Sequence, residues 1–271
     1  MNIPVLAQII LATAAGGLLS VVVAALVMWG LPGRWLTRAV SFSTGLLLAT
    51  ALLHLLPDAL ESGLTPHEAF PLLLGGILGF FVLEKFALWR HVHVGAGDDA
   101  HANSAHCDDH THAHHHVHGG AGGTLPILIG DGFHNFTDGL LLAAAFLADP
   151  ALGWATAIAV LSHELPQEIG DFMVLLSAGV GKAKALALNA LSGVAMVLGG
   201  VAGYFALDGM QAAVPYVLVI AAASFIYIAV ADLVPELHRH RHLGNASGQL
   251  ALLAAGIGTV QLIGLFAHHS H

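Results

Sequence analysis

The sequence predicts an all-α integral membrane protein with eight transmembrane helices and both termini outside. Hydrophobic residues make up 56% of the 271 positions and charged residues only 9%, and the mean hydropathy is +0.79. Soluble domains carry roughly 25% charged residues. This composition places the chain in a lipid bilayer, and we expect that bilayer to be the plasma (bacterial inner) membrane.

Eight apolar stretches are each long enough to span about 30 Å of hydrocarbon. They cover residues 4–30, 37–60, 68–90, 124–148, 151–178, 184–207, 211–236 and 249–268. No basic segment precedes the first stretch, so we expect a retained helix and not a cleaved signal peptide. Together the stretches predict a single transmembrane domain over residues 1–271.

The basic residues predict the topology. All eight fall at or near the connections 1–2, 3–4, 5–6 and 7–8: Arg34, Arg38, Lys85, Arg90, Lys182, Lys184, Arg239 and Arg241. Because cationic loops stay in the cytoplasm, both termini are predicted to lie outside. The net charge of −9 owes much to acids within the apolar stretches, and nothing resembles a basic nucleic-acid surface. We therefore expect no nucleic-acid partner.

The longest connection, residues 91–123, is rich in histidine. It contains ten of the chain's 20 histidines, four aspartates and Cys107, between glycine-rich flanks. Such a composition predicts a disordered cytosolic loop. Its nitrogen, sulfur and oxygen donors favour capture of metals such as Zn²⁺. The alternative is a solvated linker or the remnant of a purification tag. Since Cys107 is the only cysteine, no intrachain disulfide can form.

Two central stretches carry ionisable residues where a membrane helix is expected. In the fourth stretch, ILIGDGFHNFTDG, the residues Asp131, His134 and Asp138 share one helix face, and Asn135 opens onto an adjacent face. Ionisable groups at membrane depth are costly, so they mark a functional site by default.

The fifth stretch contains HELPQEIGD, in which His163 and Gln167 form an i, i+4 pair. A second stripe beside this pair consists of Glu164, Glu168 and Asp171. Pro166 removes one backbone hydrogen bond and is expected to free the Ser162 carbonyl.

Imidazole and carboxylate groups together suit Zn²⁺, Fe²⁺ and related divalent ions. Two neighbouring stripes predict two adjacent metal sites between the fourth and fifth helices. The first would use His134, Asp138, His163 and Gln167. The second would use Asn135, Asp138 and Glu164, with Glu168 as a further candidate and Asp138 as the bridge. The structural alternative is hydrogen bonding between helices, but the number of polar groups favours metal.

Further polar residues predict a pathway to and from these sites. His54 and Asp58 are an i, i+4 pair beside Pro57, interpreted as relay ligands or proton acceptors, with a capped helix end as the alternative. Asp131 and Asp171 are candidates on the same path. Glu236, next to Pro235, is a candidate ligand near the cytosolic face, as is the HRHRH stretch at 238–242, although a solvated basic loop explains that stretch equally well.

HNFTDG followed by HELPQEIGD resembles the paired fourth- and fifth-helix signatures of the ZIP (Zrt/Irt-like) metal transporters, especially the branch with HExPHExGD. The stretches SFSTGLLLATALLHLLPDAL, GFFVLEKF and SFIYIAVADLVPEL agree with it. The resemblance implies an influx carrier for Zn²⁺, often also Fe²⁺, Mn²⁺ or Cd²⁺, with a binuclear centre made of the two sets above. Two departures are Gln167, where this branch usually has histidine, and Met196-Val197, where other branches have Glu-Pro.

Two functions other than a carrier are compatible with metal-binding residues in membrane helices. An intramembrane zinc-dependent hydrolase would use HELPQ as a degenerate HExxH motif, but Gln167 replaces the second histidine and the amide-rich donor set argues against it. A metal sensor would bind ions without moving them, but a polar stripe on two helices favours a path. We expect no enzymatic activity. The expected partners are divalent metal ions, the bilayer and a second copy of the chain in a homodimer.

Overall fold

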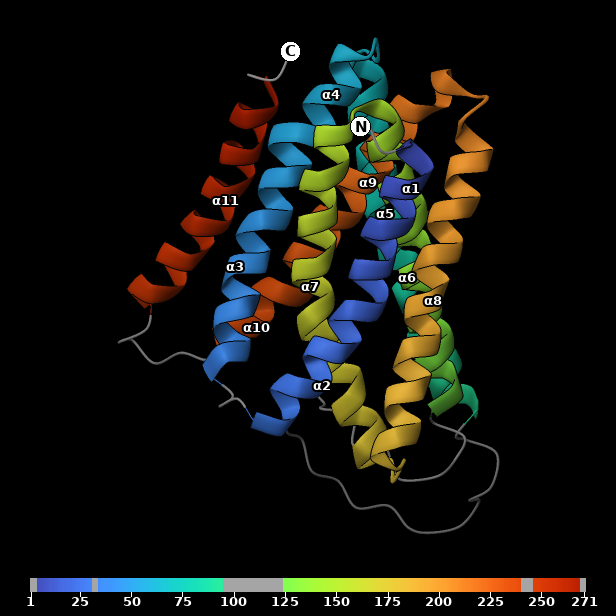
Figure 1. The fold of residues 1–271 in the computed structure, drawn as a ribbon, viewed down its shortest axis with the longest axis vertical. Helices are drawn as coiled ribbons and strands as arrows, with labels where there is room; N and C mark the ends of the chain where they lie inside the picture. Colours follow the sequence, from blue (N-terminus) through green and yellow to red (C-terminus); the bar gives the residue numbers. More distant parts are fainter. Residues whose placement is uncertain (1–3, 31–33, 95–123, 240–245, 269–271) are drawn as a thin grey trace, which may run out of the picture.

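The computed structural model describes residues 4–30, 34–94, 124–239 and 246–268, and this part of the chain is helical without any β-strand. The predicted all-α fold is therefore confirmed. Figure 1 shows the helices running up and down through one bundle, with α1 beginning and α11 ending at the same end.

Eight helical segments make up the described bundle, and three of them are interrupted. The first combines α1 (Val5–Ala14), η1 (Ala15–Leu19) and α2 (Ser20–Gly30). The second combines α3 (Arg34–Thr50), η2 (Ala51–Leu55) and α4 (Leu56–Glu61). The uninterrupted ones are α5 (Pro66–Val94), α6 (Thr124–Ala148), α7 (Pro150–Ser177), α8 (Lys182–Leu207) and α11 (Ala246–His268). The seventh segment combines η3 (Gln211–Ala213), α9 (Val214–Ile228), η4 (Ala229–Leu233) and α10 (Val234–Arg239).

Within the described residues, six stretches are long and apolar enough to cross a membrane. They are Val5–Leu26, Arg38–Glu61, Pro66–Leu83, Lys182–Leu207, Gln211–Leu233 and Ala246–Ile263. The two long helices outside this set are α6 and α7, which carry the ionisable residues. Their faces pack against each other and against α8, α3, α2 and α9.

Both ends of α7 are fixed by local hydrogen bonds. The Asp149 side chain accepts bonds from the backbone N–H groups of Ala151 (2.8 Å) and Leu152 (3.1 Å), and Pro150 occupies the first helical turn. At the other end Gly179 adopts a positive φ of 81°, which glycine tolerates without steric cost. Only Asp149 separates α6 from α7, so the two helices are antiparallel neighbours.

Close glycine contacts set the position of α6 against α8. A β-carbon at Gly139 would overlap the carbonyl oxygen of Met196, and one at Gly199 would overlap the carbonyl oxygen of Phe136. The two backbones therefore touch, as is typical of small residues between membrane helices. Any larger side chain at Gly139 or Gly199 would push α6, the helix that carries His134 and Asp138, away from α8.

The interruptions η2 and η4 are single π-helical turns just before a proline. Pro57 follows η2 and Pro235 follows η4. Proline has no N–H and its ring crowds the carbonyl four residues earlier, here Leu53 and Ala231, so the helix widens by one residue in each place.

Some predicted features fall partly or wholly outside the described residues. The helix α5 continues to Val94, into the segment predicted as a loop, and residues 95–123 with Cys107 are not described. The backbone of Glu236 belongs to α10, but its side chain lies outside the description, as does most of the stretch 238–242.

Candidate metal centre

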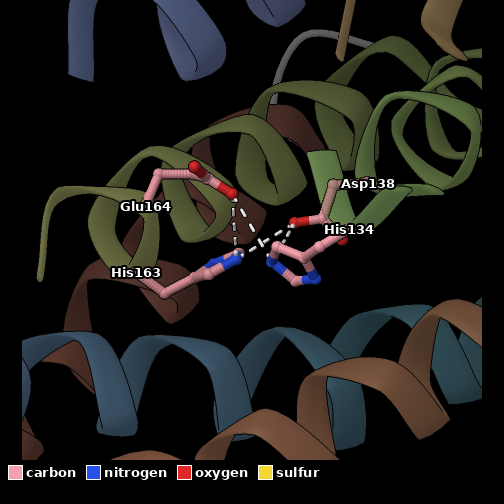
Figure 2. Close-up of side chains that lie close together, drawn as sticks. All are labelled: His134, Asp138, His163 and Glu164. Carbon is pink, nitrogen blue, oxygen red and sulfur yellow. Dashed lines mark ion pairs between the residues drawn. The ribbon is translucent and has the colours of Figure 1, made fainter. Parts of the chain in front are cut away.

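Four side chains from α6 and α7 meet in the middle of the bundle. His134 and Asp138 come from α6, and His163 and Glu164 come from α7; Figure 2 shows all four pointing toward one another. One nitrogen or oxygen atom from each lies within 4.8 Å of the others. Among the described residues this is the group of histidine and acidic side chains that could hold a metal ion.

The distances between donors match those around a tetrahedral zinc ion. His134 Nε2 lies 3.6 Å from Asp138 Oδ2 and 3.5 Å from Glu164 Oε1. His163 Nε2 lies 3.0 Å from the same Asp138 oxygen and 3.7 Å from the same Glu164 oxygen. Metal–ligand bonds of about 2.0–2.1 Å in a tetrahedron place ligand atoms roughly 3.3–3.4 Å apart. The four distances bracket that value.

Burial makes these donors costly unless a cation joins them. Asp138 and Glu164 are fully buried and His163 is 1% exposed, whereas His134 retains 24%. None of their facing nitrogen and oxygen atoms has a hydrogen-bond partner among the described residues. Two buried carboxylates without hydrogen bonds are unfavourable in a low-dielectric interior. A divalent cation between them would neutralise both charges.

A hydrogen bond orients the His163 ring. Its Nδ1 lies 3.2 Å from the carbonyl oxygen of Ala159, one turn earlier in α7. Nδ1 must carry the proton to donate to a carbonyl, which leaves a lone pair on Nε2 facing the centre. The edge of Phe225 from α9 packs against this ring, with 6.1 Å between centroids.

The carbonyl freed by Pro166 has found a partner on another helix. The Ser43 hydroxyl of α3 donates to the Ser162 carbonyl oxygen. This bond compensates the missing backbone hydrogen bond and ties α7 to α3 one residue before His163.

The two amide candidates are both anchored by Asp131. The Asn135 amide nitrogen donates to Asp131 Oδ1 (3.0 Å) and to the Asp131 carbonyl (3.2 Å), and the Gln167 amide nitrogen lies 3.3 Å from the same Oδ1. The Asn135 side-chain oxygen is buried and has no hydrogen-bond partner among the described residues. Asp131 thus holds both amides by their nitrogens, which leaves the Asn135 oxygen facing away from Asp131.

Comparison with known proteins identifies the family. The sequence model of the ZIP Zinc transporter family matches residues 3–264, nearly the whole chain. The chain belongs to the ZIP family.

Among relatives, "Zinc transporter foi" of Drosophila melanogaster is 40% identical over 141 residues, which are 52% of this chain and 20% of that protein. "Zinc transporter ZIP13" of Pongo abelii is 30% identical over 253 residues, 86% of this chain and 69% of that protein. "Metal cation symporter ZIP14" of Danio rerio is 38% identical over 148 residues, which are 54% of this chain and 30% of that protein. The match spans about a fifth of the length of the first of these relatives. ZIP membership and the apolar helices together make this chain an integral membrane protein.

Two predicted residues lie beside the ZIP centre without joining the four donors. Glu168 is fully buried, and neither of its carboxylate oxygens has a hydrogen-bond partner among the described residues. Its backbone carbonyl accepts a bond from the Asn189 amide of α8 at 3.2 Å. Asp171 is half-buried, one turn further along α7. Acidic side chains of α7 therefore continue from the metal centre toward the C-terminal end of this helix.

The remaining predicted residues are further away along the bundle. His54 lies in η2 and Asp58 in α4, both half-buried, toward the end of the bundle where the N-terminus lies (Figure 1). Asp232 of η4, which the sequence reasoning missed, lines the same cavity as His134 and His163. Its spacing from Glu236 is i, i+4 beside a proline, the same signal that drew attention to His54 and Asp58.

Proposed function

We propose that this protein carries Zn²⁺ across the membrane into the cytosol and that His134, Asp138, His163 and Glu164 form its central binding site. The observation that carries the proposal is the set of four buried donor atoms at 3.0–3.7 Å. ZIP membership and the names of the relatives support zinc as the substrate.

The charge of the site suits a mobile ion. Two carboxylates balance the two positive charges of the substrate, so the loaded centre is neutral at membrane depth. A mixture of imidazole and carboxylate also accepts Fe²⁺, Mn²⁺ and Cd²⁺, which we include as further substrates.

We propose a second ion position beside the first, bridged by Asp138. The second carboxylate oxygens of Asp138 and Glu164 and the side-chain oxygen of Asn135 are all buried without hydrogen-bond partners among the described residues. This assignment of ligands to the two ion positions differs from the one predicted from the sequence, because Glu164 faces the first position together with both histidines. Gln167 lines the cavity at the edge of the centre, where it can supply its oxygen to an ion that is leaving.

The inward direction rests on the distribution of positive charge. Arg38, Lys182 and Lys184 belong to helix ends at the end of the bundle where α6 begins and α7 ends (Figure 1). By the positive-inside rule this end is cytosolic, so both termini lie outside, in a plasma (bacterial inner) membrane. A homodimer remains compatible with these features.

A zinc hydrolase is the less favoured function. Hydrolytic zinc sites keep one coordination position open for water, whereas four protein donors surround this centre. The residue in place of the second histidine of an HExxH motif is Gln167, whose amide nitrogen is engaged by Asp131.

The test is zinc flux into proteoliposomes that contain the purified full-length protein and a zinc-sensitive dye. We expect flux from the wild type and from Asp208→Asn, a matched acid-to-amide change at the exposed end of α8. We expect none from His163→Ala. Wild-type flux no greater than that of empty liposomes refutes a carrier, and cleavage of added lipid or peptide instead would support the hydrolase.

A further inference from the structure

A cavity of about 710 Å³ lies beside the metal centre. His134, His163 and Gln167 line the part next to the centre, and from there the lining follows α7 to Met173 and the seventh segment to Leu233. Both elements run toward the end of the bundle where α7 ends and α6 begins (Figure 1). The cavity therefore lies in the half of the bundle on that side of the metal centre.

Most of the cavity wall is apolar. The apolar side chains come from several helices and include Val40, Phe80, Leu83, Phe133, Ile169 and Met173. The volume falls within the range of about 300–1,000 Å³ that is typical of small-molecule sites. An empty space of this size would deprive its walls of van der Waals contacts. Water fills it poorly, because apolar walls offer no hydrogen-bond partners. We therefore expect an apolar occupant.

The cavity opens sideways between α5 and α6. The helix α5 packs against α9, where Phe80 stacks on Tyr227 with 6.5 Å between ring centroids, and α6 packs against α8 and α7. The helices α5 and α6 themselves barely touch. At this gap the lining residues Leu83 of α5 and Phe133 of α6 are both exposed. Because both helices belong to a membrane domain, the opening faces the acyl chains of the bilayer.

Two glycines keep the cavity wide. Gly130 of α6 and Gly170 of α7 both line it, and a β-carbon at either position would meet no neighbouring group within 4 Å. They differ from Gly139, whose β-carbon would overlap the backbone of α8. Glycine weakens a helix interior, and close helix packing does not account for it at Gly130 or Gly170. What these two positions provide is room in the cavity.

We propose that the cavity is a lipid site, in which one acyl chain of a bilayer phospholipid enters between α5 and α6 and extends toward the metal centre. An acyl chain leaves hydrocarbon for an apolar wall at little cost, whereas water would have to leave bulk liquid for the same wall. On the topology proposed above, the lipid belongs to the cytosolic leaflet. Its acyl chain covers the side of His134 that retains 24% exposure and shields the centre from water.

The test uses the full-length protein in liposomes that contain a phospholipid with a photoactivatable diazirine near the end of one acyl chain. After illumination, mass spectrometry identifies the labelled residues. Val40 and Ile169 line the cavity but are buried, so only an acyl chain inside the cavity can reach them. We expect label on both. We also expect label on Leu78 and Phe81, which are exposed on α5 outside the cavity and report the surrounding bilayer.

Leucine at the two glycines provides a variant with a filled cavity. In Gly130→Leu combined with Gly170→Leu, we expect label on Val40 and Ile169 to be lost and label on Leu78 and Phe81 to stay. Each single substitution should reduce the label on the two buried residues. The control is Gly75→Leu, at an exposed glycine of α5 that also has open space around it but does not line the cavity. It should be labelled as the wild type is.

The outcomes separate the lipid from other occupants. Wild-type protein without label on Val40 and Ile169 would overturn the proposal, and so would label that persists in the variant with both leucines. Label that is missing even from Phe133 would show that a second copy of the chain covers the opening, which also overturns it. Zinc flux enters none of these measurements, so the proposed transport function and the lipid site can fail independently.

Discussion

Removal of the Asp138 carboxylate is expected to weaken zinc binding at the centre strongly without harming the fold. Asp138 Oδ2 lies 3.0 Å from His163 Nε2 and 3.6 Å from His134 Nε2, so it is one of four donors and half of the negative charge. Truncating one partner of a buried charge pair costs about 2–5 kcal/mol. A loss of about 3 kcal/mol in Asp138→Ala corresponds to roughly 100-fold weaker binding.

In the absence of metal, the Asp138→Ala substitution should leave the stability of the protein unchanged or raise it. Both oxygens of Asp138 are buried without hydrogen-bond partners among the described residues, so the empty centre is destabilised by its own carboxylates. Asp138→Ala should therefore melt at the same temperature as the wild-type apoprotein or higher. A ligand at 100 times its dissociation constant stabilises a protein by about 2.7 kcal/mol, and the variant should lack this gain.

The assay is thermal unfolding in detergent with and without Zn²⁺, together with flux in proteoliposomes. Residues 98–118 contain eight histidines that would bind zinc elsewhere, so both measurements should use a host chain that lacks them. Asp138→Asn is the matched control, which keeps one oxygen and loses the charge, and its affinity should be intermediate. An Asp138→Ala protein that still gains wild-type stabilisation and flux would refute the proposed donor set.

Three further predictions follow from the same centre. Gln167→His should raise affinity for Zn²⁺ relative to Mn²⁺, because imidazole is the softer donor; competition curves for the two metals measure it, and curves that do not move would separate Gln167 from the ion. Deletion of residues 98–118 should preserve folding and basal flux but lower the number of bound metal ions, because no described helix is interrupted; an inserted but inactive deletion variant would make the loop part of the path. Affinity of the centre should fall as the pH is lowered, because histidine and carboxylate side chains bind metal only in their deprotonated forms and protons compete with the ion. Isothermal titration of the loop-deleted chain measures this, and affinity that does not change with pH would remove the histidines from the ligand set.

Local features were readable from the sequence because their causes are local. Hydropathy over about 20 residues predicts membrane helices, and the i, i+3, i+7 spacing placed Asp131, His134 and Asp138 on one face of α6. The same locality explains Pro166, whose missing N–H frees the Ser162 carbonyl wherever the helix lies. That Ser43 would supply the hydrogen bond was beyond the sequence, since the two serines are 119 positions apart.

The division of ligands was not predictable in the same way. His163 and Glu164 are neighbours in the sequence and about 100° apart on an ideal helix, so they were assigned to different metal positions. In the structure, both side chains reach the same point, because α6 packs against the face of α7 that lies between His163 and Glu164. The Gln167 amide nitrogen is instead directed to Asp131. Asp232 stands four residues before Glu236 and beside Pro235, so the spacing that drew attention to His54 and Asp58 could have found it.

The sequence by itself determined that the chain is a helical membrane protein of the ZIP family, and which two helices carry the donors, because hydropathy and motif spacing are properties of contiguous residues. The tertiary structure alone decided which donor atoms meet, on which side of them the cavity lies, and that Asp232 faces it. The meeting of the donors and the position of the cavity depend on the depth and rotation of α6 and α7 within the bundle. Both are set by backbone contacts between distant segments, such as Gly139 against Met196 and Gly199 against Phe136, which no local pattern encodes.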